Sequence, residues 1–159
     1  MRSQRVVEHK VGMGDVAPDF TLPSQSGEMV RLWDLLAQSS VVLYFYPKNE
    51  TPVCTVQACA FRDSYEVFTK AGAEVVGISS DSTGSHSRFA SNYRLPFILL
   101  SDRRREVRRR YGVPNTMGTL PGRATYVIDR EGIVHHVFSS QFNAARHVTE
   151  ALSILQKLS

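Results

Sequence analysis

The hydrophobic positions of this chain form short segments that alternate between strand-like and helix-like patterns. Continuous apolar runs rich in β-branched and aromatic residues predict three fully buried strands, at VVLYFY (41–46), EVVGIS (74–79) and FILL (97–100). Two later runs, ATYVID (124–129) and IVHHVF (133–138), flank a short turn that contains Gly132 and therefore predict a β-hairpin.

Helical spacing is present between and after these runs. Ala58, Phe61, Tyr65 and Phe68 lie three or four positions apart and predict a helix that ends at Gly72. Three further segments predict helices, namely 85–94, the Arg-rich stretch 103–110 continuing to Gly112, and 143–158.

The order of these elements predicts an α/β fold. A β-α-β unit is followed by α-β, then by the hairpin and a last helix, and βαβ units form parallel sheets with helices on both faces. Because the hairpin adds antiparallel edges, we expect a thioredoxin-like fold with a mixed central sheet flanked by helices. We expect residues 1–159 to form one such domain, with residues 1–13 as a polar N-terminal extension.

Composition places the chain among ordinary globular proteins. It has 42% hydrophobic and 21% charged residues, and no apolar run approaches the roughly 20 residues of a membrane span. Its start, MRSQRVVEHKVGMGD, has no apolar segment of signal-peptide length. We expect a cytoplasmic protein without membrane contact, or one in the plastid stroma or thylakoid lumen if a transit peptide has been removed.

The net charge of +4 comes from one segment. RRREVRRR (103–110) carries six Arg and one Glu, which leaves 13 basic and 14 acidic residues elsewhere. We interpret the segment as a solvated helix face, with an anion-binding or partner-docking patch as the alternative. Nucleic-acid binding is not expected, because no aromatic residue interleaves the arginines and no binding motif is visible.

Both cysteines lie in the stretch PKNETPVCTVQAC (47–59), where four residues separate Cys54 from Cys59. A thioredoxin-type redox pair has two residues between its cysteines. A zinc site needs further ligands, and the five histidines show no ligand spacing relative to the cysteines, so we expect no metal and no other cofactor. The remaining interpretations are a reactive thiol pair of another kind, or two ordinary buried cysteines in a helix.

Thr51-Pro52 predicts where this helix begins. Threonine is a good N-cap and proline is favoured at the first helical position, which places Cys54 in the first turn. Its sulfur then lies near unpaired backbone N–H groups and the positive end of the helix dipole, and both favour the nucleophilic thiolate. Cys59 lies more than a turn further along, so we expect Cys54 to attack and Cys59 to respond.

An intact helix would keep the two thiols apart. Five residues correspond to about 7.5 Å of rise and about 140° of rotation, which puts the Cα atoms roughly 8–9 Å apart. A disulfide needs less than about 7 Å. A bond between Cys54 and Cys59 therefore requires the start of this helix to unwind.

These residues resemble those of a known family. Pro47, Thr51 and Cys54 stand in the order Pro-x-x-x-Thr-x-x-Cys of the peroxiredoxins, and the cysteine five positions on resembles the Q-type branch, also called bacterioferritin comigratory proteins. The similarity covers nearly all of the chain after about residue 13, through GDVAPDFTLP (14–23), SSDSTGSHSRFASNYRLPFILLSD (79–102), YGVP (111–114) and LPGRATYVIDREG (120–132). FSSQFNAARHV (138–148) is most similar to cyanobacterial and plastid members.

The resemblance implies a role for each motif residue. Cys54 would be the peroxidatic cysteine, which attacks hydrogen peroxide or an organic hydroperoxide and becomes a sulfenic acid. Thr51 would hydrogen-bond the peroxide and the thiolate, Pro47 would shield the pocket, and Arg123 would stabilise the thiolate and the leaving oxygen. Cys59 would resolve the sulfenic acid as an intramolecular disulfide, and thioredoxin or a thioredoxin-like reductant would reduce it. We expect such an enzyme to be a monomer.

The resemblance leaves substrate preference and two other functions open. Members of the branch usually have Gly or another small residue at the position of Val53, and a commoner acidic pair where this chain has Asn49-Glu50. One alternative function is a general disulfide oxidoreductase, although such enzymes use a Cys-x-x-Cys motif, which this chain lacks. The other is a non-enzymatic peroxide sensor or chaperone that uses the unwinding helix as its signal.

Overall fold

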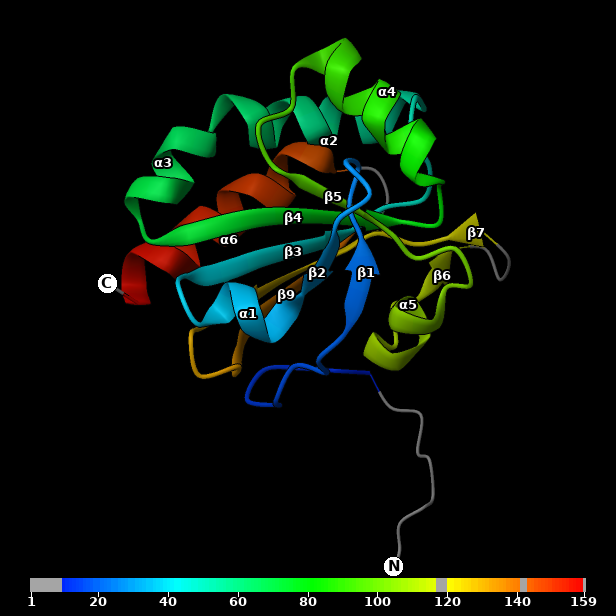
Figure 1. The fold of residues 1–159 in the computed structure, drawn as a ribbon. Coiled ribbons are helices and arrows are strands. Elements are labelled where there is room, and N and C mark those ends of the chain that lie inside the picture. Colours follow the sequence, from blue (N-terminus) through cyan, green and yellow to red (C-terminus); the bar gives the residue numbers. More distant parts are fainter. Residues whose placement is uncertain (1–9, 117–119, 141–142, 159) are drawn as a thin grey trace, which may run out of the picture.

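The computed structural model describes residues 10–116, 120–140 and 143–158, so residues 1–9 of the expected N-terminal extension lie outside the described part. A five-stranded sheet forms the centre, in the order β5-β4-β3-β8-β9 (Figure 1). Its strands are β3 (Ser40–Phe45), β4 (Ala73–Ser79), β5 (Ile98–Ser101), β8 (Ala124–Ile128) and β9 (Val134–Ser139). β3 pairs in parallel with β4, and β4 with β5, whereas β8 is antiparallel to both β3 and β9. The mixed sheet confirms the predicted α/β fold.

Helices cover both faces of this sheet (Figure 1). One face carries α2 (Pro52–Asp63), α3 (Tyr65–Lys70), α4 (Thr83–Tyr93) and α6 (Ala144–Leu158), and the other carries α1 (Leu32–Leu36) and α5 (Glu106–Tyr111). Because side chains alternate along β3, Val42 and Tyr44 pack on the first face, and Leu43 and Phe45 on the second. No helix in the described ranges is long and apolar enough to cross a membrane.

Gly77 in β4 makes room for an aromatic layer under α2. A Cβ atom at this position would lie 2.9 Å from Tyr44 Cζ, closer than Cβ atoms approach other heavy atoms in proteins. Tyr44 in turn stacks on Phe61 of α2, with 4.5 Å between the ring centroids. The glycine therefore allows α2 to lie tightly on the sheet.

All the predicted strands and helices are present, but three details differ. The helix predicted from Ala58 to Phe68 is two helices, because Ser64 between α2 and α3 has a non-helical backbone (φ −103°, ψ 4°). The Arg-rich helix begins only at Glu106, because Arg105 has a left-handed backbone (φ 59°). The hairpin strand β8 lies inside the sheet, so only β9 forms an antiparallel edge.

Five short elements were not predicted. They are α1 and the strands β1 (Thr21–Pro23), β2 (Met29–Arg31), β6 (Asn115–Thr116) and β7 (Leu120–Pro121). β1 pairs with β2, and β6 with β7, as two-stranded ribbons outside the central sheet. Segments this short do not repeat a hydrophobic period, so the pattern along the chain carries no signal for them.

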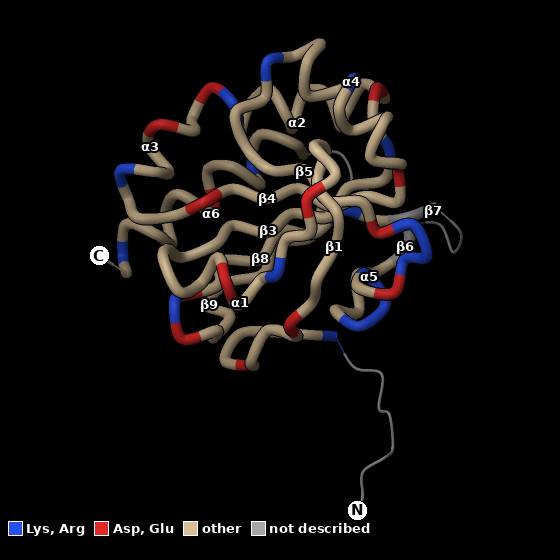
Figure 2. The backbone as a smooth tube through the Cα atoms, in the orientation of Figure 1, with Lys and Arg blue, Asp and Glu red and all other residues tan. Residues whose placement is uncertain are grey.

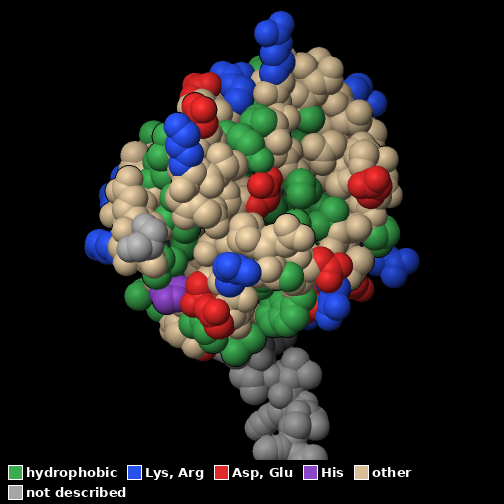
Figure 3. All heavy atoms as spheres, turned by 60° about the vertical axis from the view of Figure 1, so that its left-hand side comes forward, with side chains coloured by type: hydrophobic (Ala, Val, Ile, Leu, Met, Phe, Trp, Pro, Cys, Tyr) green, Lys and Arg blue, Asp and Glu red, His purple; other side chains and the backbone are tan. Residues whose placement is uncertain are grey.

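The arginine-rich segment is not uniformly solvated. Figure 2 shows its basic residues gathered at α5 and the turn before it, whereas basic and acidic side chains are interspersed on the face drawn in Figure 3. The exposed members are Arg103, Arg104, Arg105, Arg109 and Arg110. Arg108 is only 8% exposed, so the interpretation as a solvated face is wrong for this residue.

Candidate active site

The first turn of α2 follows closely on the end of β3. A short loop (46–51) leads from the strand to Pro52, and Thr51 has the extended backbone of an N-cap (φ −87°, ψ 153°), as predicted. Cys54 is thus the third residue of the helix. The side-chain cap expected of Thr51 is not formed, and its hydroxyl instead donates to the Lys48 carbonyl oxygen at 2.8 Å.

Cys54 and Arg123 meet between α2 and the sheet. Each is only 2% exposed. β8 pairs with β3 such that Ala124 lies opposite Phe45, and this register brings Arg123 next to the loop before α2. Arg123 Nη1 donates to Cys54 Sγ at 3.4 Å. A buried guanidinium in hydrogen-bond contact with sulfur favours a thiolate over a thiol.

Gln57 belongs to the same site and was missed by the sequence interpretation. It is fully buried one helical turn after Cys54. Arg123 Nη1 donates to Gln57 Oε1 at 2.5 Å, so one guanidinium nitrogen contacts both the sulfur and the amide. Among the described residues, Gln57 Nε2 has no hydrogen-bond partner. The available signal was the three-residue spacing from Cys54, which puts both side chains on one face of a helix.

Cys59 lies further along α2, partly exposed, and both cysteines are free thiols. The helix is continuous from Pro52 to Asp63 and includes both of them. Their Cα atoms are therefore separated as in an intact helix, which is too far for a disulfide. The structure corresponds to the reduced, helical arrangement.

A buried hydrogen-bond network holds the loop before α2. Asn49 is 3% exposed, and its Oδ1 accepts from the Tyr46 hydroxyl at 2.7 Å. Its Nδ2 lies 3.0 Å from both Ser85 Oγ and His86 Nδ1, and its backbone N–H donates to Asp81 at 2.9 Å. Burial lowers the pKa of His86, which keeps the ring neutral and able to accept from Asn49. The network fixes the loop that carries the motif proline and threonine.

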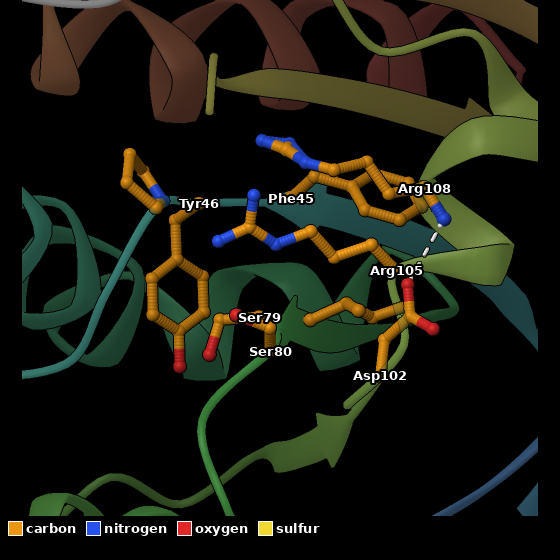
Figure 4. Close-up of a pocket in the computed structure, with 9 residues that line it drawn as sticks. Phe45, Tyr46, Ser79, Ser80, Asp102, Arg105 and Arg108 are labelled. Carbon is orange, nitrogen blue, oxygen red and sulfur yellow. Dashed lines mark hydrogen bonds between the residues drawn. The ribbon is translucent and has the colours of Figure 1, made fainter. Parts of the chain in front are cut away.

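Pro47 lines a small polar pocket beside this loop (Figure 4). The pocket lies between the ends of β3 and β4 and the start of α5, and its other lining residues are Phe45, Tyr46, Ile78, Ser79, Ser80, Asp102, Arg105 and Arg108. In Figure 4 the side chains of Arg105 and Arg108 extend in the same direction, toward Tyr46. The arginine-rich segment therefore reaches the surroundings of the candidate site.

An apolar hollow adjoins the first turns of α2. It is lined by Pro52, Val53 and Val56 of α2 and by Asn143, Ala144 and Ala145 at the start of α6. Val56 is 58% exposed. Val53 stands where the Q-type branch usually has a small residue. Its side chain lines this open apolar hollow.

A hydrogen bond between buried side chains joins α6 to β8. His147 is fully buried, its Nδ1 lies 2.7 Å from Thr125 Oγ1, and its Nε2 lies 2.8 Å from the Ser140 carbonyl oxygen. Burial lowers the pKa of His147 to about 4, so the ring is neutral at neutral pH. The ring therefore donates from Nε2 to Ser140 and accepts at Nδ1 from Thr125, which follows Arg123 by two residues.

The chain is similar to known proteins in both sequence and fold. The AhpC/TSA family matches residues 13–137. A protein named peroxiredoxin Q, chloroplastic, from Triticum aestivum is 54% identical over 157 residues, which is 98% of this chain and 72% of that protein. The protein of the same name from Sedum lineare is 55% identical over 150 residues, or 94% of this chain and 80% of that protein.

Two solved structures have the same fold over nearly their whole length. Peroxidoxin BcpB from Mycobacterium tuberculosis matches with a TM-score of 0.87 and 39% identity, over 94% of this chain and 99% of that chain. Peroxiredoxin Q from Xanthomonas campestris matches with a TM-score of 0.81 and 29% identity, over 92% and 97%.

Proposed function

Since this chain belongs to the AhpC/TSA family and is a Q-type peroxiredoxin, a thiol peroxidase, we propose that Cys54 is its peroxidatic residue. The observation that carries this assignment is the 3.4 Å hydrogen bond from the buried Arg123 guanidinium to Cys54 Sγ. The thiolate is the nucleophile in such chemistry, and Cys54 is the thiol that combines the first helical turn with a fixed cation.

The proposed reaction begins with attack of the Cys54 thiolate on one oxygen of a hydroperoxide. An S–O bond forms as the O–O bond breaks, and an electron pair passes from sulfur to the leaving oxygen. This oxygen takes up a proton and departs as water or an alcohol, while Cys54 is left as a sulfenic acid. Arg123 stabilises the negative charge on the thiolate and then on the leaving oxygen.

Thr51 and Pro47 complete the proposed peroxide site. The Thr51 hydroxyl hydrogen is engaged by the Lys48 carbonyl oxygen, which leaves the lone pairs of Oγ1 to accept the hydrogen of a bound hydroperoxide. Pro47, held in the anchored loop, shields the sulfur from bulk water. In this role Thr51 accepts a hydrogen bond from the peroxide.

Cys59 is the proposed resolving residue. Its thiol attacks the sulfur of the Cys54 sulfenic acid, and water leaves as the intramolecular disulfide forms. The continuous α2 has to unwind at its start for this step, because an intact helix keeps the two residues too far apart. A dithiol of the thioredoxin type then reduces the disulfide by thiol–disulfide exchange and is itself oxidised.

We propose hydrogen peroxide and organic hydroperoxides as substrates. A structure of the Xanthomonas campestris bacterioferritin comigratory protein, 28% identical, is described in terms of alkyl peroxide reduction activity. In this chain the apolar hollow beside Val53 offers a surface for an alkyl group. We further propose a monomer that acts in the cytoplasm, or in a plastid as the names of its chloroplastic relatives suggest.

A coupled assay with thioredoxin, thioredoxin reductase and NADPH tests this function. We expect NADPH to be consumed continuously when hydrogen peroxide or a bulky alkyl hydroperoxide is added. A single equivalent of oxidation without turnover would instead identify a peroxide sensor. Reduction of insulin disulfides without peroxide would identify a general disulfide oxidoreductase.

Replacing Arg123 by methionine should slow the oxidation of Cys54 by peroxide. The variant keeps an apolar chain of similar length but loses the guanidinium, and removal of one electrostatic stabiliser at a reacting centre typically costs about 100- to 1,000-fold in rate. The thiolate absorbance, titrated against pH, should show a smaller thiolate fraction at neutral pH. An unchanged titration and an unchanged rate would remove Arg123 from the mechanism.

Replacing Thr51 by valine keeps the shape of the side chain and removes its hydroxyl. The lost hydrogen bond to the Lys48 carbonyl oxygen is exposed, so its loss should cost about 0.5 kcal/mol of unfolding free energy, the lower end for such bonds. The second-order rate of peroxide reduction should fall by more than this loss explains, and stopped-flow oxidation beside urea unfolding separates the two. If the rate is unchanged, peroxide does not use the hydroxyl.

A further inference from the structure

Arg108 differs from the other arginines of the segment 103–110 because its side chain is buried, 8% exposed among five exposed neighbours. Burial of a guanidinium is costly unless its donors are paired. Burial, together with the charge of Arg105, lowers the pKa of Arg108 to about 10, which leaves the side chain charged at neutral pH. A charge kept inside the protein needs a partner.

The hydrogen-bond partner of the Arg108 guanidinium is the carbonyl oxygen of Gly122. Arg108 Nη1 donates to it at 3.0 Å, and Nη2 donates to the same oxygen. Gly122 is buried and directly precedes Arg123. Glycine has the greatest backbone freedom of all residues, so this two-nitrogen contact fixes the peptide from which the Arg123 side chain extends. On the far side of Arg123, its carbonyl oxygen accepts from the Ser139 hydroxyl at 3.2 Å.

Arg108 is itself anchored to the sheet through Asp102. The carboxylate of Asp102, 3% exposed at the end of β5, accepts from the backbone N–H of Val107 at 3.3 Å and of Arg108 at 3.0 Å. Figure 4 draws the second of these bonds. Contacts thus run from the sheet through Asp102 and Arg108 to Gly122, and from there to the guanidinium that touches Cys54.

We propose that Arg108 is a positioning residue for peroxide reduction, which holds the Gly122–Arg123 peptide so that the Arg123 guanidinium contacts the Cys54 sulfur. The inference rests on the proposed function through the role of Arg123. Because Arg108 acts through Arg123, its replacement should have no effect on the reaction once the Arg123 guanidinium has been removed.

The test is a double-mutant cycle with R108M and R123M, in which the peroxide oxidation rate and the thiolate titration of Cys54 are both measured. We expect R108M to slow oxidation by about 10- to 100-fold, because a misplacement of roughly 1 Å can cost about 100-fold. It should also reduce the thiolate fraction. The double variant should match R123M alone. R104M, a change at an exposed arginine of the same segment, is the matched control and should leave both quantities unchanged.

Two results would overturn the proposal. The first is an R108M variant whose oxidation rate and thiolate titration are unchanged. The second is an R108M substitution that lowers the oxidation rate by the same factor in the wild type and in the R123M variant. Thermal unfolding and circular dichroism report whether the variants fold. If R108M does not fold, R108K takes its place in the cycle, because lysine keeps the charge but loses the planar two-nitrogen contact. If R123M itself has no effect, the proposed role of Arg123 is rejected, whereas an effect of R123M without one of R108M rejects only the positioning role.

Discussion

Replacing Cys54 by serine is expected to abolish peroxide reduction. The serine hydroxyl is not ionised at neutral pH and is a poor nucleophile toward the O–O bond. The variant also keeps nearly the same size at a position that is 2% exposed, so the fold around Arg123 should persist. No NADPH consumption above the background is expected in the coupled assay, with either hydrogen peroxide or an alkyl hydroperoxide.

Mass spectrometry supplies the control for this result. The wild type exposed to one equivalent of peroxide should gain an oxidised Cys54, either as a sulfenic acid or as the disulfide with Cys59. In the Cys54→Ser variant the introduced serine should gain no oxygen, and Cys59 alone should react slowly. Turnover that survives in this variant would mean that the roles of the two cysteines have been assigned wrongly.

The central sheet could be predicted because each of its strands has a local signature. VVLYFY gives β3 from its unbroken apolar run, and the turn containing Gly132 gives the pairing of β8 with β9. The start of α2 could be predicted for the same reason, since Thr51-Pro52 fixes the first helical position within two residues of sequence. An element can be predicted from sequence where its own residues and their immediate neighbours determine its structure.

The contacts around the sulfur could not be predicted because they join distant parts of the chain. Arg123 reaches Cys54 across 69 positions, and only the register of β8 on β3 brings them together. Without the resemblance to peroxiredoxins, the sequence would offer Arg123 as a surface charge. The hydrogen bond between Asn49 and His86, 37 positions apart, depends in the same way on how the loop and α4 pack.

The charge pattern led to the wrong prediction that Arg108 is solvated, for a related reason. Six arginines in RRREVRRR look equivalent in sequence, and a run of charges is usually solvated. Arg105 precedes the first residue of α5, and its left-handed backbone sets which face of this short helix points inward. Asp102 then fixes that orientation, and Arg108 is directed into the protein. The outcome depends on one backbone conformation that the composition of the segment does not reveal.

Replacing Cys59 by serine should leave the first oxidation of Cys54 rapid and stop thioredoxin-linked turnover. The nucleophile and the Arg123 contact are intact in this variant, so peroxide should still be reduced once per molecule. No intramolecular disulfide can follow, and the sulfenic acid should persist or be carried on to sulfinic acid by excess peroxide. Stopped-flow measurement of the first turnover, beside the coupled assay, separates these two steps.

Amide hydrogen exchange in the same pair of proteins tests the unwinding of α2. In the wild type, oxidation should increase exchange in the first turns of the helix, because the disulfide cannot span the intact helix. In the Cys59→Ser variant the sulfenic acid imposes no such strain, and protection should stay close to that of the reduced protein. A wild-type disulfide that forms with full protection of residues 52–59 would refute the unwinding step, and sustained turnover in Cys59→Ser would show that Cys54 is resolved by another thiol.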